Sequence, residues 1–367
     1  MKITSILAVI LLAVSALVTA GLSASSADRA GPAEHAGRLP VNSPLRDLAK
    51  RADLLVGTAV DFDAFTKDSV YHDRIGTEFS SITAENVMKW QLVEPTRGEL
   101  DFSAADQLVA AAQRNHQGVR GHTLLWHNQP PTWLTDGVSS GAITPTELRN
   151  ILRQHVMDEV SHFRGKVYQW DVANEVIDDN ANLRDTIWLQ NLGPGYLADV
   201  FRWAHQADPH VKLFLNDYNV EAGNAKSDAY FRLVQDLLKQ HVPIDGFGVQ
   251  GHLSVHDGFP SAAAIAANLK RFNDLGLQTS VTEADVRMIM PPDGVKLQAQ
   301  AQGYSALMQG CLLAPRCVSF TVWGYTDKYS WVPGFFTGQG AANLLDENFN
   351  AKPAYESVRA DLTLGRR

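Results

Sequence analysis

The chain has 367 residues, of which 45% are hydrophobic and 20% charged, and its formal net charge is -8 at pH 7. It contains no run of lysine and arginine, which argues against a nucleic acid or an anionic membrane as partner and favours a neutral substrate. Once an N-terminal export segment, described next, is set aside, the remaining length suits a single domain with an α/β barrel fold.

The first residues have the pattern of an export signal. Lys2 gives a positive start, and an apolar run from Ile6 to Val18 leads into small residues up to Ala27. That run is too short to span a bilayer, and no stop-transfer cluster of charges follows it. We therefore expect a signal peptide over residues 1–27, a flexible lead-in over residues 28–43 and a secreted, extracellular protein.

Eight short apolar runs rich in β-forming residues follow, each ending in a polar or aromatic cluster. They are LLVGTAVDF from Leu54, FSSITAEN from Phe79, VRGHTLLWH from Val119, VYQWDVANE from Val167, KLFLNDYN from Lys212, GFGVQGHL from Gly246, TSVTEADV from Thr279 and VSFTVWGYTD from Val318.

Helical patterns lie between these runs, for example those beginning at Ala104, Thr146 and Asp228. Strand and helix alternating eight times predict a parallel sheet closed into a barrel. No linker or second composition class interrupts the pattern, so no carbohydrate-binding module is expected. The predicted fold is α/β, a single-domain (β/α)8 TIM barrel over residues 44–367.

Polar side chains gather at the carboxyl ends of the runs, the side on which barrel enzymes build their sites. A purely structural barrel would not need this set, so it predicts a pocket. Its members are Glu85 and Asn86, His122 and His127, Asn174 and Glu175, Asn216, Gln250 and His252, Glu283 and Asp285, and Trp323.

Runs four and seven each end in a glutamate, Glu175 and Glu283. Retaining glycoside hydrolysis needs two facing carboxyl groups about 5–5.5 Å apart, one protonated to release the leaving group and one ionised to attack the anomeric carbon. Taken singly, either glutamate could equally be a salt-bridge partner or a metal ligand. The two together predict a catalytic pair at that separation.

The motifs together resemble those of the family 10 glycoside hydrolases, which are mostly endo-1,4-β-xylanases. The resemblance covers the chain from about Asp47 to Leu362 and rests on eight segments in one order. They are SITAENVMKW, RGHTLLWHNQPP, WDVANE, LNDYN, FGVQGH, VTEADV, VWGYTDKYSW and NAKPAY.

This resemblance implies that Glu175 is the acid/base and Glu283 the nucleophile of a retaining endo-1,4-β-xylanase. It also implies that Asn174 holds the sugar 2-hydroxyl and that His252 and Asp285 form a hydrogen-bonded set with Glu283. Glu283 and Asp285 are two residues apart and so share one face of a strand. For His252 alone, a backbone-bonded core imidazole would be an equally good interpretation.

The resemblance assigns further residues to substrate binding. Polar groups that can form forked hydrogen bonds to hydroxyls bind the glycone, and aromatic faces stack on pyranose rings. A lone lysine such as Lys89 is usually solvated, and Trp90, Trp188 and Trp203 are expected to fill the core. The binding set is Glu85, Asn86, Lys89, His122, Trp126, His127, Gln129, Tyr218, Gln250, Trp323 and Trp331.

Three residues differ from the commoner family pattern, namely Ala173, Gly251 and Ala284. None of them carries a reactive group. We therefore expect the differences to affect the packing around Glu283 and not the class of reaction.

Cys311 and Cys317 are the two cysteines of the chain. An exported protein meets an oxidising compartment, which favours a short-loop disulfide between them. The alternative is a pair of buried thiols, because geometry can forbid the bridge in any compartment.

Two other functions compete with a xylanase. A non-catalytic carbohydrate-binding barrel would keep the aromatic residues, but the intact pair of glutamates argues against it. A metal-dependent amidohydrolase would explain His122, His127 and His252, but those enzymes have an HxH pair where this chain has TAVDF. We expect no cofactor or metal, xylan and xylo-oligosaccharides as partners, and a monomer.

Overall fold

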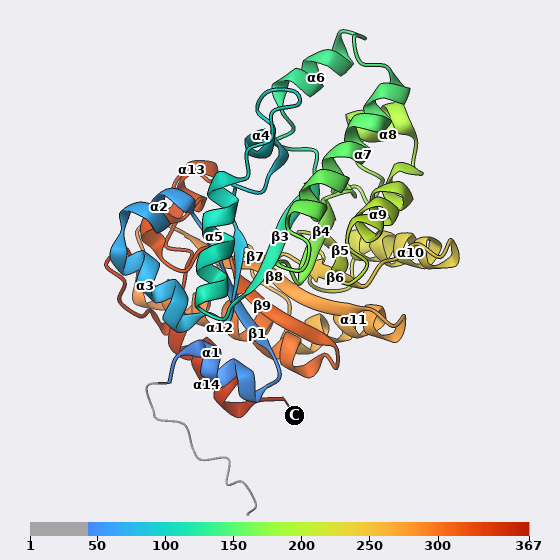
Figure 1. Ribbon diagram of the computed structural model, residues 1–367. Coiled ribbons are helices and arrows are strands. Elements are labelled where there is room, and N and C mark those ends of the chain that lie inside the picture. Colours follow the sequence, from blue (N-terminus) through green and yellow to red (C-terminus); the bar gives the residue numbers. More distant parts are fainter. Residues whose placement is uncertain (1–42, 367) are drawn as a thin grey trace, which may run out of the picture. The chain divides into compact units, whose positions relative to one another are not determined.

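Eight parallel strands form a closed ring in the computed structural model, which describes residues 43–366 (Figure 1). The ring closes because the first strand also pairs with the last, with Leu55 opposite Ser319 and Val56 opposite Phe320. This confirms the predicted (β/α)8 barrel. Its strands are β1 Leu55–Val60, β2 Ser81–Ala84, β3 Gly118–Leu125, β4 Gln169–Asn174, β5 Lys212–Asp217, β6 Gly246–Val249, β8 Gln278–Ile289 and β9 Cys317–Val322.

The sixth predicted run is two strands, because the chain breaks direction between them at Gly251, whose φ is +83°. After this residue, β7 (His252–Ser254) pairs with the outer part of β8, and His252 lies opposite Asp285. The long β8 continues to Ile289, where β10 (Gln339–Gly340) pairs with it in antiparallel fashion. The break therefore places His252 beside the seventh barrel strand.

Helices surround the strands (Figure 1). They are α1 Leu45–Arg51, α2 Phe62–Lys67, α3 Ser69–Glu78, α4 Trp90–Val93, α5 Ser103–Arg114, α6 Thr132–Ser139, α7 Pro145–His162, α8 Ile187–Leu192, α9 Tyr196–Ala207, α10 Ala225–Lys239, α11 Ala262–Asp274, α12 Gly294–Leu313, α13 Val332–Phe335 and α14 Pro353–Leu364, with a 3₁₀ turn η1 at Asp327–Tyr329.

Polar caps set the starts of several of these helices. The helix predicted from Asp228 begins three residues earlier, because the side chains of Asn224 and Ser227 form a reciprocal capping box. The helix predicted from Thr146 begins at Pro145, after the N-cap Thr144.

The barrel interior holds a buried ion pair. Arg120 and Asp171 bond to each other, both about 1% exposed, and the Arg120 guanidinium lies 5.6 Å from the ring centre of Phe214. Gly248 faces Arg120, and a Cβ at this glycine would lie 3.1 Å from Nη2 of Arg120 and 2.4 Å from Oδ1 of Asn216. A glycine at this position lets the amide of Asn216 reach the centre of the barrel mouth.

Two of the three tryptophans predicted to fill the core do so. Trp90 and Trp188 are 5% and 1% exposed, and their rings stack with centroids 5.7 Å apart. For Trp203 the prediction is wrong. Its indole is half-buried on α9, with the Arg149 guanidinium 5.4 Å from the ring centre, so a cation and not the core covers it.

The predicted disulfide between Cys311 and Cys317 is present, with the two Cα atoms 5.3 Å apart. Both residues are fully buried, and the bridge links the end of α12 to the first residue of β9. It therefore fixes the strand that leads to Trp323.

The predicted signal peptide and nearly all of the predicted lead-in lie outside the described residues. Among residues 43–366, no helix has both the length and the apolarity needed to cross a membrane.

Candidate active site

A cavity of about 920 Å³ opens at the carboxyl ends of the barrel strands. It brings together nearly all the residues assigned to catalysis and binding, while Asp285 is buried behind it. The predicted residues that line it are Glu85, Asn86, Lys89, His122, Trp126, His127, Gln129, Asn174, Glu175, Tyr218, Gln250, His252, Glu283, Trp323 and Trp331.

Glu283 lies on β8 and is 4% exposed. Nδ2 of Asn216 donates a hydrogen bond of 2.7 Å to its Oε1, and Nε2 of His252 lies 3.2 Å from its Oε2. Burial alone would raise the pKa of Glu283, but the hydrogen bond to His252 and the nearby imidazoles of His122 and His252 outweigh it and lower the pKa. The carboxyl group is therefore held in its ionised form.

His252 is in turn held by Asp285. Its Nδ1 lies 2.9 Å from Oδ2 of Asp285, and that oxygen also accepts a hydrogen bond of 2.8 Å from Nε1 of Trp331. Burial alone would lower the pKa of His252, but the negative charges of Asp285 and Glu283 raise it to about 10. A half-buried imidazolium therefore lies between two carboxylates.

Glu175 follows β4 and has a φ of +57°, in the left-handed region. Its Oε1 accepts hydrogen bonds of 3.1 Å from Nε2 of Gln250 and 3.3 Å from Nδ2 of Asn174. Nδ1 of His127 lies 3.8 Å from its Oε2. The carboxyl group of Glu175 thus contacts neutral amides and one imidazole, and no arginine or lysine in the described part of the chain contacts it directly.

Three side-chain amides connect the two glutamates. Nδ2 of Asn216 donates to Oδ1 of Asn174 at 3.0 Å, and Nε2 of Gln250 donates to the same oxygen at 3.3 Å. With the Asn174 amide turned over, its nitrogen could donate to the main-chain oxygen of Asn216 at 3.2 Å and its oxygen could accept from Nε1 of Trp126 at 3.3 Å. That nitrogen would also face the side-chain nitrogen of Asn216 at 3.0 Å, which places two donors in contact, and both bonds to Oδ1 would be lost, so the orientation with the oxygen there is preferred. The bridge fixes both carboxyl groups to one frame.

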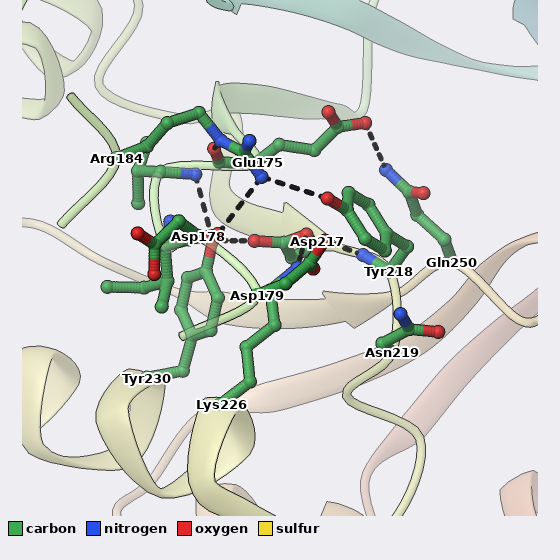
Figure 2. A network of polar contacts seen from close by, with 12 residues as sticks. Glu175, Asp178, Asp179, Arg184, Asp217, Tyr218, Asn219, Lys226, Tyr230 and Gln250 are labelled. Carbon is green, nitrogen blue, oxygen red and sulfur yellow. Dashed lines mark hydrogen bonds and ion pairs between the residues drawn. The ribbon is translucent and has the colours of Figure 1, made fainter. Parts of the chain in front are cut away.

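Arg184 and Tyr218 lie beside Glu175 (Figure 2). Nε of Arg184 donates to the main-chain oxygen of Glu175 at 2.7 Å, and its Nη2 donates to the phenol oxygen of Tyr218 at 3.0 Å. Nζ of Lys226 lies 3.4 Å from the ring centre of Tyr218 and donates to Oδ1 of Asp217 at 2.9 Å. Burial raises the pKa of Asp217 to about 7, although Lys226 opposes the shift.

A second group of polar residues lies on the side of β2 and β3. Nζ of Lys89 donates to Oδ1 of Asn86 at 3.1 Å and lies 4.8 Å from the ring centre of Trp126. Burial lowers the pKa of Lys89, so the lysine is not the solvated residue that a lone lysine usually is. Burial, helped by the charge of Asp61, raises the pKa of Glu85 to about 7.

The structure adds residues that the sequence did not assign. Asn216 is among the polar residues predicted at the ends of the strands, but its hydrogen bond to Glu283 also needs the space that the glycine at position 248 leaves. Arg184 lies nine residues after Glu175 in a loop without any strand or helix signal. Other unassigned residues that line the cavity are Asn128, Asn219, Arg287, Phe335 and Phe336.

No group of three or more histidine, cysteine, aspartate or glutamate side chains among residues 43–366 has a geometry that could hold a metal ion.

Comparison with known proteins gives a consistent result. The sequence model described as Glycosyl hydrolase family 10 matches residues 44–361. An endo-1,4-beta-xylanase of Agaricus bisporus is 42% identical over 317 residues, 86% of this chain and 93% of that protein. Endo-1,4-beta-xylanase B of Thermotoga neapolitana is 41% identical over 319 residues, 86% of this chain and 90% of that protein.

Solved structures agree with these sequence matches. Xylanase 10B from Thermotoga petrophila RKU-1, solved in complex with xylobiose, superposes with a TM-score of 0.84 at 39% identity and covers 89% of this chain and 98% of its own. A GH10 xylanase from Bispora sp. MEY-1, also solved with xylobiose, has a TM-score of 0.83 at 33% identity and covers 87% of this chain and 99% of its own.

Proposed function

The chain belongs to glycosyl hydrolase family 10 and is an endo-1,4-β-xylanase, and we propose that it cleaves internal β-1,4 bonds of xylan by double displacement. The observation that carries this proposal is the pair of glutamates in one amide frame, with Glu283 held ionised between His252 and Asn216. The predicted separation of about 5–5.5 Å between their carboxyl oxygens stays a prediction.

In the first step, an oxygen of Glu283 forms a bond to the anomeric carbon while the bond to the leaving sugar breaks. Glu175 donates its proton to the leaving oxygen, as a general acid does. The product is a glycosyl ester on Glu283. Forming the ester removes the negative charge that His252 and Asn216 had stabilised.

In the second step, Glu175 accepts a proton from water, and that water attacks the anomeric carbon from the face the leaving group has vacated. The bond to Glu283 breaks, and its carboxylate regains its charge in contact with His252. Two inversions at one carbon give net retention of the β-configuration.

The surrounding side chains fit the binding of a neutral sugar chain. We assign Asn174 to the 2-hydroxyl at the cleavage site, and Trp323 and Trp331 to the walls around that sugar. Tyr218, with one ring face occupied by Lys226, offers its other face to the sugar on the leaving-group side. The glycone contacts are assigned to Glu85, Asn86, Lys89, His122, Trp126, His127, Gln129 and Gln250.

Xylose differs from glucose by lacking a hydroxymethyl group, and walls formed by Gln129, Trp323 and Trp331 leave little room for one. Steric rejection of one such group is worth only about 1–3 kcal/mol. Weak activity on glucans or aryl cellobiosides is therefore expected.

The test of this function is the anomeric configuration of the first product. Xylopentaose hydrolysis followed by ¹H NMR should yield the β-anomer before mutarotation, and soluble xylan should lose viscosity faster than soluble cellulose at equal enzyme. An initial α-anomer would contradict double displacement, and no cleavage of xylan would contradict the function itself.

We also propose that the chain is exported and acts as a monomer. The N-terminal pattern and the Cys311–Cys317 bridge support an oxidising, extracellular location. Mature protein in the culture medium with an N-terminus between Ala20 and Asp28, and a monomer mass by light scattering, are the expected results.

A further inference from the structure

We propose that Arg184 is a positioning residue that links the leaving-group platform Tyr218 to the acid/base Glu175. The proposal rests on the function above, which gives these two residues their roles. It concerns the efficiency of proton donation and not the binding of the glycone.

The first observation is the place of Arg184 in its loop. After Glu175 the chain forms a tight hairpin in which Ile177 bridges Leu183 and the nitrogen of Arg184 donates to the main-chain oxygen of Val176 at 2.8 Å. The guanidinium then turns back over the hairpin. Its Nε donates to the oxygen of Glu175 at 2.7 Å, and its Nη2 donates to the oxygen of Ile177 at 3.2 Å.

The second observation is the backbone conformation that these bonds hold. Glu175 has a φ of +57°, which costs free energy in a residue that carries a Cβ. Its peptide is fixed on both sides, since its nitrogen donates to the oxygen of Asn216 at 2.9 Å and its oxygen accepts from Arg184. Without the guanidinium, only the first of these two contacts opposes relaxation of the peptide.

The third observation is the rigidity of Tyr218. Its phenol oxygen accepts the bond of 3.0 Å from Arg184, and its ring covers the ammonium of Lys226 at 3.4 Å. Lys226 is 5% exposed and bonds to Asp217 at 2.9 Å and to Asp179 at 3.4 Å (Figure 2). The ring can therefore move little without moving Arg184.

These contacts form a short path from the leaving group to the acid. A sugar stacked on the free face of Tyr218 contacts a ring whose hydroxyl oxygen is hydrogen-bonded to Arg184. The same guanidinium also donates to the main-chain oxygen of Glu175. Arg184 does not touch the reacting atoms, so its effect acts through the direction in which the Glu175 carboxyl group points. A small misplacement of a catalytic group can cost a large part of its rate contribution.

The alternative is that Arg184 only stabilises the fold of the hairpin through its bonds to the main chain. A purely structural role would change the amount of folded enzyme and would lower the activity on every substrate by the same factor. A positioning residue for the acid should matter most where the leaving group needs a proton. The dependence of rate on the leaving group separates these two roles.

The experiment compares wild type, Arg184→Met and Arg184→Lys on aryl β-xylobiosides whose phenols span a wide range of pKa, and on xylopentaose. For Arg184→Met we expect kcat/KM to fall roughly 10- to 100-fold on xylopentaose and on poor phenol leaving groups. With the best leaving group, which needs little protonation, the change should stay below about threefold. Arg184→Lys, which keeps one donor near the Glu175 oxygen, should recover part of the loss.

Two further variants serve as controls. Tyr218→Phe keeps the ring but removes the oxygen that Arg184 contacts, and combined with Arg184→Met it should lower activity by less than the product of the two single effects. Arg149→Met removes an exposed arginine on the outer helices, bonded to Asp199, and should leave the leaving-group dependence unchanged. Thermal unfolding and circular dichroism verify that each variant is folded.

An equal loss on all leaving groups, or no loss on xylopentaose, would overturn the positioning role of Arg184. A wild-type enzyme that cleaves neither xylopentaose nor any xylobioside would instead refute the proposed function. The two failures are therefore distinguishable in one set of assays.

Discussion

The two glutamates are held in different ways. Glu283 is fixed by its side chain, through Asn216 and through an imidazolium that Asp285 stabilises. Glu175 is fixed mainly through its backbone, by the main-chain oxygen of Asn216 and by Arg184, while its carboxyl group contacts amides and lies 3.8 Å from His127.

This difference matches the demands of the two roles. A nucleophile must be ionised whenever substrate arrives, so a fixed positive charge beside it is useful. An acid/base must both hold and release a proton in one cycle, so a permanent ion pair with its carboxyl group would be harmful. Amides can hydrogen-bond both forms of Glu175 without fixing its charge. The predictions below test this contrast, from the largest expected effect to the smallest.

Asp285→Asn should have the largest effect of these variants, because it removes the charge that keeps His252 protonated. Glu283 would then lose the cation that lowers its pKa. A charge-assisted hydrogen bond is worth about 1.5–3 kcal/mol, so kcat/KM on xylopentaose should fall roughly 10- to 100-fold. The acidic limb of the pH–rate profile should move to higher pH.

Asp257→Asn is the matched control, since Asp257 is an exposed carboxylate that lies 3.5 Å from Arg287 and does not contact His252. It should change kcat/KM by less than about twofold. If Asp285→Asn were as active as this control, the charged frame around Glu283 would have no catalytic role.

The charged contacts between His252, Asp285 and Glu283 also predict how the stability of the fold depends on pH. The folded pKa of His252 is about 10, above its ordinary value of 6.5, so its contribution to stability is complete below pH 6.5 and is lost as the pH rises through 10. Glu283, with a lowered pKa, contributes in the opposite direction and loses its contribution under acid conditions.

Urea denaturation between pH 7 and pH 10 measures this dependence. The unfolding free energy of the wild type should fall by up to about 1 kcal/mol per pH unit more than that of His252→Gln. Parallel curves for the two proteins would show that His252 is not a persistent imidazolium.

Glu85 tests the glycone side of the cavity, where burial raises its pKa to about 7. An ionised carboxylate binds sugar hydroxyls more strongly than a neutral one, so KM for xylopentaose should fall severalfold between pH 6 and pH 8. Glu85→Gln, which cannot ionise, should keep the higher KM throughout. A wild-type KM that did not change over this range would contradict the assignment of Glu85 to substrate binding.

The disulfide is not among the contacts that hold Glu283 and Glu175, so its removal should change stability and leave activity unaffected. The double variant Cys311→Ala/Cys317→Ala should lose about 2 kcal/mol of unfolding free energy, the loop-entropy value for so short a loop. Its kcat/KM at 25 °C should stay within twofold of the wild type. A large loss of activity would show that the start of β9 positions Trp323 more delicately than the burial of both cysteines suggests.

Much of this architecture could be predicted from the sequence because the periodic signals are strong. Each apolar run contains a strand of the ring, and the polar ends of the runs meet in one cavity because parallel strands end on one side. The prediction that failed concerns a residue without such a periodic signal. Trp203 lies on an amphipathic helix whose sequence does not show that Arg149 covers the indole.

The positions of Arg184 and Asn216 could not be predicted for a related reason. The backbone of Glu175 has a positive φ, although position 175 is neither a glycine nor an asparagine, so the sequence does not indicate this conformation. The hydrogen bond from Arg184 depends on the hairpin that follows Glu175. Asn216 reaches Glu283 because a glycine on the neighbouring strand leaves space. Both contacts depend on spatial neighbours and not on local pattern.

The most direct test of the two assignments is the configuration of azide adducts formed by Glu175→Ala and Glu283→Ala. With an aryl xylobioside that has a good leaving group, Glu175→Ala should form the glycosyl-enzyme and stall, because no base activates water. Azide needs no deprotonation, so it should restore turnover and give the β-azide. With Glu283→Ala, azide can only replace the nucleophile from the opposite face and should give the α-azide. NMR of the two products decides the assignment: exchanged configurations would reverse the roles of Glu175 and Glu283, and full activity of either variant on xylan would contradict the site.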